Sequence, residues 1–354
     1  MSYVTRTRIY PVDPHQPAPG IIDIAAQAIR DGRLVAFPTE TVYGLGAKAT
    51  DADAVARIFA AKQRPTTDPI IVHIASVAAL EGVAVDVPAL AYTLAAQFWP
   101  GALTLVLRRA DLIPANVSAG RTTVAVRMPD HSVARALIEA AGLPIAAPSA
   151  NTFSRPSATT AAHVLHDLED HVDVILNGGA ARIGLESTVL DLTGSVPIIL
   201  RPGGVTLEAL RTVIPNLQVR ERFRAADETA DSPGELLRHY APNAALYLLV
   251  GDVEQVNRYM RDHSAALRLQ GVRVGILAPD EEADAFRGDG VPVVALGSRG
   301  DLAGIGHGLF AHLREIDRLN VDVILIRAFP REGLGAALWD RLVRAAEGRV
   351  IDVR

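Results

Sequence analysis

Short apolar runs alternate with amphipathic stretches along most of this chain from residue 33 onward. A run of four to eight apolar residues predicts a strand, whereas apolar residues that recur every three or four positions predict a helix. Because several runs are apolar at every position, we expect a sheet that helices cover on both faces, as in an α/β domain. The strands predicted in the first part are 34–38, 69–75, 102–108, 122–128, 144–149, 173–177, 187–192 and 197–201.

The alternation stops at residues 220–243, which end in the segment SPGELLRHYAPN. It then resumes with predicted strands at 245–251, 272–279 and 321–329, and with helices that end near residue 270 or span 302–318 and 336–346. A chain of 354 residues exceeds one ordinary hydrophobic core, so two domains are expected. The pattern therefore predicts an α/β domain, a connecting segment and a second, smaller α/β domain.

Two helices have recognisable ends in the sequence. Thr50 and Asp53 have the spacing of a capping box at the start of one helix. Asp130 stands where it can cap another helix, which we expect to stop at Gly142 because glycine readily adopts the left-handed conformation of a helix terminus.

Composition narrows the chemistry. The chain has no cysteine, which excludes disulfides, thiolate nucleophiles and cysteine metal sites, and its ten histidines form no HExxH pattern, so no protein-held metal is predicted. A formal net charge of -5 disfavours a protein that mainly coats nucleic acid. The N-terminal segment lacks the apolar core of a secretory signal, and no run of 18 apolar residues follows, so we expect a cytoplasmic protein.

Polar groups gather where predicted strands end, although no P-loop is present. The segment PTETVYGLGAKA (38–49) follows the first strand and places Thr41 beside Glu40. It is either an ordinary turn, in which Thr and Gly are common, or a loop that binds a small polar substrate.

Lys62 and Arg64 stand at the end of the helix that precedes strand 69–75. Cations at a helix C-terminus interact favourably with its dipole, which explains both residues without a ligand. Alternatively, they form a two-cation clamp that neutralises phosphate oxygens during transfer at phosphorus. His73, taken alone, is more often a packed histidine than a catalyst.

Further polar residues lie at the ends of other predicted strands. In open α/β sheets, ligands bind beyond the carboxyl ends of the strands, so these side chains either bind phosphate, ribose or a carboxylate, or form solvated turns and surface ion pairs. They are Arg127, Ser149, Asn151, Ser157, Ser187 and Arg201.

Six segments occur in an order that resembles the YrdC-type domain of threonylcarbamoyl-AMP synthases. They are PTETVYGLG, KQRP with PIIVH, VAVRMPDH, PSAN, ESTVLDL and ILRPGG. The resemblance extends to SPGELLRHYAP, which is similar to the long two-domain form of the family. It implies a YrdC-like open twisted sheet with flanking helices at 15–215, a linker over the active site at 216–243, and a smaller Rossmann-like α/β domain at 244–354.

The resemblance implies a nucleotidyltransferase, L-threonylcarbamoyladenylate synthase, which converts ATP, L-threonine and bicarbonate to threonylcarbamoyl-AMP and pyrophosphate. Mg²⁺ would arrive with ATP. A separate complex would then transfer the threonylcarbamoyl group to tRNA, giving N6-threonylcarbamoyladenosine. The enzyme itself would bind tRNA weakly at most and would have no membrane partner.

Site residues are implied position by position. The resemblance makes Lys62 and Arg64 the catalytic cations. The implied ATP site consists of Lys62, Arg64, Asp68, Thr123, Ser149, Asn151, Ser157, Arg201, His239 and Tyr240. The implied threonine site consists of Thr41, His73, Arg127, Ala147 and Ser187.

The sequence departs from the family pattern in two places. Asp68 stands where Asn is common, and a carboxylate near phosphates is unfavourable unless a cation intervenes. Glu235, Leu236 and Leu237 replace residues that are usually Met, basic and Tyr, which leaves the contacts between the linker and ATP open.

Two alternative functions use the same domain. Enzymes of hydrogenase maturation adenylylate carbamoyl phosphate, but they carry cysteine zinc fingers that a cysteine-free chain cannot form. A double-stranded RNA or tRNA binder is the other alternative, and the acidic net charge disfavours it as a main function.

Overall fold

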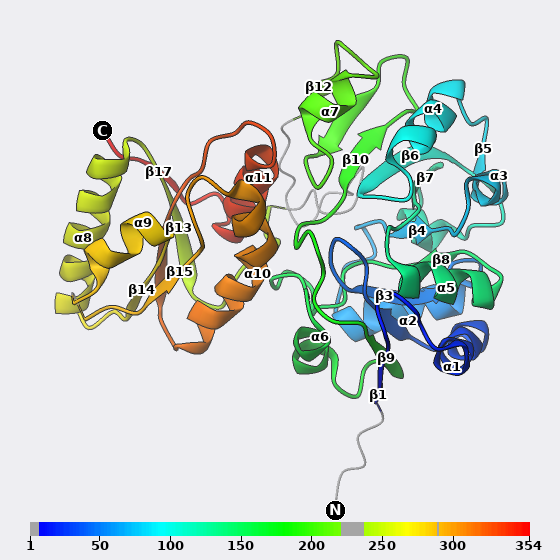
Figure 1. The fold of residues 1–354 in the computed structure, drawn as a ribbon, viewed down its shortest axis with the longest axis horizontal. Helices are drawn as coiled ribbons and strands as arrows, with labels where there is room; N and C mark the ends of the chain where they lie inside the picture. The colour runs from blue at the N-terminus through cyan, green and yellow to red at the C-terminus, as the bar shows by residue number, and fades with distance from the viewer. Residues whose placement is uncertain (1–6, 221–236, 289) are drawn as a thin grey trace, which may run out of the picture. The chain divides into compact units, whose positions relative to one another are not determined.

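The computed structural model describes residues 7–220, 237–288 and 290–354, which form two compact units (Figure 1). The first unit contains the described residues up to Phe153 and from Ser157 to residue 220, and the second contains Ser154–Pro156 and the described residues from Leu237 onward. Of the predicted linker, residues 221–236 lie outside the described residues, and with them Glu235 and Leu236. Leu237 is partly buried.

The strands of the first unit are short. They are β1 (Arg8–Pro11), β2 (Val35–Phe37), β3 (Gly44–Lys48), β4 (Ile71–His73), β5 (Ala84–Val85), β6 (Leu103–Arg109), β7 (Thr123–Arg127), β8 (Ile145–Ala146), β9 (Val174–Asn177), β10 (Thr188–Asp191), β11 (Ile198–Arg201) and β12 (Gln218–Val219). In the described part of this unit they make one mixed sheet in the order β1-β9-β2-β3-β8-β4-β7-β6-β10-β11-β12, with β5 paired to β6.

Helices cover one face of this sheet along most of its width. The helices of the unit are α1 (Pro19–Arg30), α2 (Ala52–Lys62), α3 (Leu80–Val83), α4 (Ala89–Phe98), α5 (Ser132–Ala141), α6 (Ala161–Leu168) and α7 (Leu207–Arg211). Apolar side chains of α2, α3, α4, α6 and α7 form one core with residues such as Leu45, Val72 and Val126 of the sheet.

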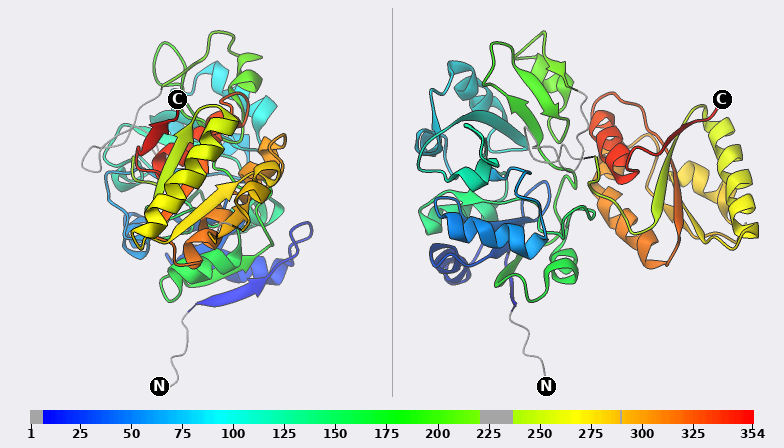
Figure 2. Two further views of the ribbon diagram at one scale, coloured as in Figure 1. Left: turned by 90° about the vertical axis from the view of Figure 1, so that its left-hand side faces the viewer. Right: turned by 180° about the vertical axis from the view of Figure 1, so that it is seen from behind.

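On the opposite face, the helices that the structure describes cover only part of the width of the sheet. Helices α1 and α5 pack side by side there, over Val35 and Phe37 of β2 and Ile145 of β8 (Figures 1 and 2). His73 of β4 is in register with Ile145 and so shares its face. From β4 to β11 the same face continues as a separate apolar floor of Ile71, Val106, Ala125, Val189 and Leu200. The two cores on opposite faces explain why so many strands are apolar throughout.

All eight strands predicted in the first part are present; seven are shorter than their apolar runs, and β6 has the length of its run but is shifted by one residue. Strands β1, β3, β5 and β12 were not predicted. Strands β5 and β12 have two residues each and lack a run to detect, and β3 begins inside the segment 38–49, which was interpreted as a turn.

Both predicted helix caps are wrong by one residue. Asp51, rather than Thr50, caps α2, because its carboxylate accepts hydrogen bonds from the backbone N–H groups of Asp53 and Ala54. His131, rather than Asp130, caps α5 by accepting a hydrogen bond from the backbone of Val133. The predicted end of α5 is confirmed, since Gly142 has the left-handed conformation with φ of 69°.

The second unit is an α/β domain with a parallel sheet. Its strands are β13 (Ala245–Val250), β14 (Val274–Ala278), β15 (Val293–Ala295), β16 (Val323–Arg327) and β17 (Val350–Asp352). Its helices are α8 (Val253–Leu269), α9 (Asp280–Ala283), α10 (Leu302–Arg318) and α11 (Gly335–Ala345). The three predicted strands and the helices at 302–318 and 336–346 are therefore present.

The strand order of this sheet departs from the Rossmann order. In its described part, the order is β15-β14-β16-β13-β17, with every pair parallel. The fourth strand of the unit thus lies between the second and the first, which are neighbours in a Rossmann sheet. Figure 1 shows α8 and α9 on one side of the sheet and α10 and α11 on the other.

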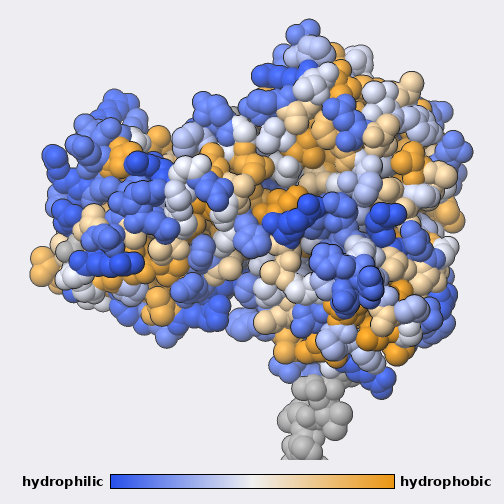
Figure 3. Space-filling model, viewed as in Figure 1, coloured by the Kyte–Doolittle hydropathy of each residue, from blue (hydrophilic) through white to orange (hydrophobic). Residues whose placement is uncertain are grey.

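Hydrophilic side chains cover much of the face of the second unit that is visible in Figure 3. Among the residues that the structure describes, no helix is long and apolar enough to cross a membrane.

Candidate active site

One row of paired residues crosses the part of the sheet that α1 and α5 leave uncovered. His73 ends β4 in register with Arg127, which ends the parallel strand β7. Continued by one residue, the register of β6 and β7 places Thr104 opposite Arg127. Thr104 is in register with Val189 of β10, which in turn pairs with Arg201 of β11. At ~4.8 Å between strands, this cross-sheet row is about 19 Å long.

Three groups fix the guanidinium of Arg127. Its Nε donates to the backbone oxygen of Gly101 at 3.0 Å, and its Nη1 donates to Oγ1 of Thr41 at 2.9 Å. Its Nη2 lies 2.6 Å from Oε1 of Glu40, and both side chains of this ion pair are at most 4% exposed. An arginine buried at a strand end with two N–H groups to spare can bind a carboxylate in a bidentate geometry.

The loop between β2 and β3 holds the partners of Arg127 in place. Oγ1 of Thr41 and Oγ1 of Thr39 are 2.7 Å apart, and the hydroxyl of Thr39 donates to the backbone oxygen of Val42 at 2.6 Å. Thr39 thereby closes a tight turn, which directs Glu40 and Thr41 to the same guanidinium. The segment 38–49 therefore contains an ordinary turn, and the same turn places side chains where they can contact a ligand.

A second polar group occupies the other end of the row. Ser187, just before β10, has its hydroxyl 2.7 Å from that of Thr104. Arg201 donates from Nη2 to the backbone oxygen of Ser187 at 2.9 Å and to its hydroxyl at 3.3 Å. The predicted residues Ser187 and Arg201 are therefore in direct contact, and Thr104 connects them to the strand beside Arg127.

His73 is buried beside Arg127 as a neutral imidazole. Burial, followed by the positive charge of Arg127, lowers the pKa of His73 to about 3. Its Nδ1 is buried and has no hydrogen-bond partner among the residues that the structure describes. A neutral imidazole in this position offers an acceptor to a ligand that carries N–H or O–H donors.

We expect His73 to make the protein sensitive to mild acid. Unfolding exposes His73 and restores its pKa to about 6.5, so the unfolded chain binds a proton that the folded protein excludes, and stability falls as the pH falls from about 6.5 to about 3. Between pH 7 and pH 5, His73 should lower the free energy of unfolding by about 2 kcal/mol. Urea denaturation of the wild type and His73→Gln at both pH values measures this contribution. If the free energies of unfolding of the wild type and His73→Gln differ by the same amount at pH 7 and at pH 5, the contribution of His73 is excluded.

Lys62 connects the end of α2 to the loop after β8. Its Nζ donates to the backbone oxygens of Ser149 and Asn151, and its side chain is buried. The predicted phosphate-site residues Lys62, Ser149 and Asn151 are thus brought together. These contacts also show that Lys62 has a structural role besides any role toward phosphate.

Arg64 and Asp68 form a buried ion pair. Nη2 of Arg64 lies 3.0 Å from Oδ2 of Asp68, and the two side chains are 3% and 0% exposed. Nη2 also donates to the backbone oxygen of Pro69 at 2.7 Å, and Nε donates to that of Asp68 at 3.2 Å. The structure therefore supplies the cation that makes a carboxylate at position 68 tolerable beside an anionic ligand.

Other predicted residues lie around these groups. Ser157 donates to Glu186, the residue before Ser187, at 2.5 Å. Ala147 donates its backbone N–H to Ile71 of β4 at 2.9 Å. Thr123 lies four residues before Arg127 in β7, so the two side chains are on the same face of the sheet. Thr123 is at the other end of the strand, ~13 Å away.

His239 and Tyr240 belong to the second unit. The ring of Tyr240 is fully buried, with the ring of Phe310 and the guanidinium of Arg341 each 5.2 Å away, and the imidazole of His239 meets it edge-on at 4.0 Å. Packing within the second unit accounts for the position of both rings, and their contact with ATP stays a prediction.

Two polar residues of the site, Thr104 and Glu186, were not predicted, and Thr39 and Glu40 were noted in the segment 38–49 but not placed among the site residues. Thr104 had a detectable signal, because it is a polar residue inside the apolar run 102–108. The contacts of Glu40 and Glu186 depend on residues 87 and 29 positions away, which no local pattern reveals.

Within residues 7–220, 237–288 and 290–354, no group of three His, Cys, Asp or Glu side chains is arranged to hold a metal ion. The acidic side chains of the site already have partners, Glu40 with Arg127, Asp68 with Arg64 and Glu186 with Ser157.

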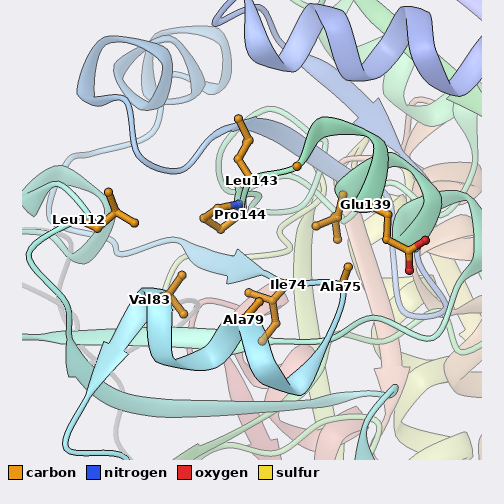
Figure 4. Close-up of a pocket in the computed structure, with 11 residues that line it drawn as sticks. Ile74, Ala75, Ala79, Val83, Leu112, Glu139, Leu143 and Pro144 are labelled. Carbon is orange, nitrogen blue, oxygen red and sulfur yellow. The ribbon is translucent and has the colours of Figure 1, made fainter.

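A separate apolar pocket of about 310 Å³ lies between α3, α5 and the chain after β4 (Figure 4). None of the described residues that line it is a predicted site residue, and Glu139 is the acidic residue among them. Its lining lacks the cations that an anionic substrate requires, so we assign the site to the cross-sheet row instead. The lining residues are Ile74, Ala75, Ala79, Gly82, Val83, Leu112, Ile138, Glu139, Gly142, Leu143 and Pro144.

Comparison with known proteins covers both units. A family model described as Telomere recombination (Sua5, YciO and YrdC) matches residues 27–203, and one described as Threonylcarbamoyl-AMP synthase, C-terminal domain, matches residues 205–347. A threonylcarbamoyl-AMP synthase of Bacillus subtilis is 45% identical over 328 residues, which cover 92% of this chain and 93% of the relative. A threonylcarbamoyl-AMP synthase of Pyrococcus abyssi is 44% identical over 336 residues, which cover 94% of this chain and 96% of the relative.

The fold comparison agrees. The crystal structure of P. abyssi Sua5 complexed with L-threonine has a TM-score of 0.91 and 43% identity, and it covers 98% of this chain and 100% of the relative. The expected α/β fold is therefore confirmed, as is the family indicated by the six sequence segments. With relatives this similar along nearly the whole length, this chain belongs to the threonylcarbamoyl-AMP synthase family.

Proposed function

We propose that this protein is an L-threonylcarbamoyladenylate synthase, which joins L-threonine, bicarbonate and ATP to give threonylcarbamoyl-AMP and pyrophosphate. The observation that carries the proposal is the fixed guanidinium of Arg127, buried beside Thr41 and His73 at one end of the cross-sheet row. It provides a carboxylate site, surrounded by hydroxyl and imidazole groups that match the polar side chain of threonine.

We expect the nucleotide to bind along the same row. Ser187 and Arg201 lie toward its other end, and Lys62, Ser149 and Asn151 form a polar group at the loop after β8. In the proposed reaction, the amine of threonine loses a proton and adds to CO₂, which forms from bicarbonate with loss of water, to give a carbamate. A carbamate oxygen then attacks the α-phosphorus of ATP, and the bond from that phosphorus to the leaving pyrophosphate breaks. Lys62 and Arg64 would neutralise the charge that develops on the phosphates.

The residues of the site suit a reaction without an enzyme nucleophile. The chain has no cysteine, and the hydroxyls of Thr41 and Ser187 bond to arginines and other hydroxyls rather than to a base. We infer that the protein acts by positioning two anions and neutralising them. Mg²⁺ would enter with ATP, and the threonylcarbamoyl group would pass to a tRNA-modifying complex in the cytoplasm.

Pyrophosphate release tests the proposal directly. The assay contains ATP, Mg²⁺ and bicarbonate, and it compares L-threonine with L-serine, L-allothreonine and no amino acid. We expect release to require both bicarbonate and L-threonine. Release that does not depend on threonine would favour the carbamoyl phosphate reaction, and no release from the folded protein in any mixture would favour RNA binding.

A further inference from the structure

Glu40 is a buried acidic residue of the site to which the proposed reaction gives no role. Its side chain is 1% exposed, and its Oε1 lies 2.6 Å from Nη2 of Arg127. Its second oxygen, Oε2, is also buried and accepts no hydrogen bond from any residue that the structure describes. Because buried polar atoms in native proteins almost always have partners, this oxygen requires a donor from a ligand or from water.

The groups around Arg127 match the charges of a free amino acid. Arg127 offers N–H donors, which suit a carboxylate, whereas Glu40 Oε2 and His73 Nδ1 offer acceptors, which suit an ammonium or a hydroxyl. The pair of Arg127 and Glu40 has no net charge. A zwitterion therefore adds no uncompensated charge to this buried site, whereas a simple carboxylate adds one.

The distances allow a single ligand to reach both side chains. In an α-amino acid, the ammonium nitrogen is about 3 Å from the carboxylate oxygens, as bond lengths and angles dictate. A carboxylate bound ~2.9 Å from the guanidinium of Arg127 thus places the ammonium within about 6 Å of it. The carboxylate of Glu40 contacts the same guanidinium, at 2.6 Å, so a ligand that turns its ammonium to the Glu40 side of Arg127 can donate a hydrogen bond to it.

We propose that Glu40 binds the α-ammonium of the amino acid substrate and so makes the site selective for zwitterionic amino acids over other carboxylates. The inference rests on the proposed function, because it takes L-threonine as the substrate. A residue that only fixed Arg127 would affect every carboxylate equally. Glu40 should instead affect those ligands that carry an ammonium.

The test compares L-threonine with (R)-3-hydroxybutanoate, which is L-threonine without its amino group. Binding to wild type, Glu40→Gln and Glu40→Asp is measured by isothermal titration calorimetry and by inhibition of pyrophosphate release. We expect Glu40→Gln to lower the affinity for L-threonine by about 10- to 100-fold, the effect of losing one hydrogen bond to a charged group. The affinity for 3-hydroxybutanoate should not fall. Glu40→Asp, which keeps the charge, should retain the preference for L-threonine. Glu282→Gln, a matched change at the buried ion pair of Glu282 and Arg327 in the second unit, should leave it unchanged.

Two results would overturn the inference. One is an equal loss of affinity for both ligands in Glu40→Gln, which would make Glu40 a positioning residue for Arg127. The other is equal affinity of the wild-type protein for 3-hydroxybutanoate and L-threonine, which is measured without any variant. A wild-type protein that binds neither ligand would instead contradict the proposed function.

Discussion

Replacing Arg64 by alanine should lower the free energy of unfolding by about 3–5 kcal/mol, because it removes the cation that neutralises a fully buried carboxylate. Arg64 Nη2 is 3.0 Å from Asp68 Oδ2, and neither side chain is more than 3% exposed. The same variant should lower the rate of pyrophosphate release by about 10²- to 10³-fold, since transfer at phosphorus loses a charge-stabilising group. Urea denaturation and the pyrophosphate assay measure the two effects separately.

Asp68→Asn provides the control that separates stability from catalysis. In the double variant Arg64→Ala with Asp68→Asn, the buried charge is gone, so we expect about 2 kcal/mol or more of the lost stability to return. Pyrophosphate release should stay low, because the cation is still missing. A double variant that is as unstable as Arg64→Ala would exclude the ion pair as the cause, and one with wild-type turnover would exclude Arg64 from catalysis.

The hydrophobic pattern was sufficient to predict most strands of both units, because continuous apolar runs are unambiguous when a sheet is covered on both faces. Strand β3 escaped because it contains Gly44 and Gly46, and glycine weakens a strand signal. The structure explains Gly46, since a Cβ there would lie 2.7 Å from the ring of Phe37 and 2.8 Å from Ile145. That requirement comes from tertiary packing and cannot be detected locally.

Residues of the site were predictable where they end a strand. Arg127 stands near the end of an apolar run, which is where ligands bind in open α/β sheets, whereas His73 lies inside the run 69–75 and was assigned to the site only through the family resemblance. His73 and Arg127 are in register because β4 lies next to β7, and Thr104 lies opposite Arg127 because β6 is on the other side of β7. No single segment of the sequence encodes this strand order. The same limit explains why Glu40 and Arg127 were both noted in the sequence but their pairing was not.

Replacing Arg127 by methionine should raise the concentration of L-threonine needed for half-maximal pyrophosphate release by at least about 100-fold, because two charge-assisted hydrogen bonds to the carboxylate are lost. It should also lower the free energy of unfolding by about 3–5 kcal/mol, since the buried carboxyl group of Glu40 loses the guanidinium 2.6 Å away. Methionine approximately retains the length of the arginine side chain and limits the cavity.

Arg127→Met combined with Glu40→Gln distinguishes the loss of the threonine site from a general loss of folding. The combined change removes both charges, so the free energy of unfolding should recover by about 2 kcal/mol or more while the response to L-threonine stays weak. The ATP dependence should remain close to wild type, because Lys62 and Arg64 are held by other contacts, to Ser149, Asn151 and Asp68. High concentrations of L-threonine should therefore partly restore pyrophosphate release to Arg127→Met but not to Arg64→Ala. An unchanged threonine dependence in Arg127→Met would remove Arg127 from the substrate site, and with it the observation on which the proposed function depends most.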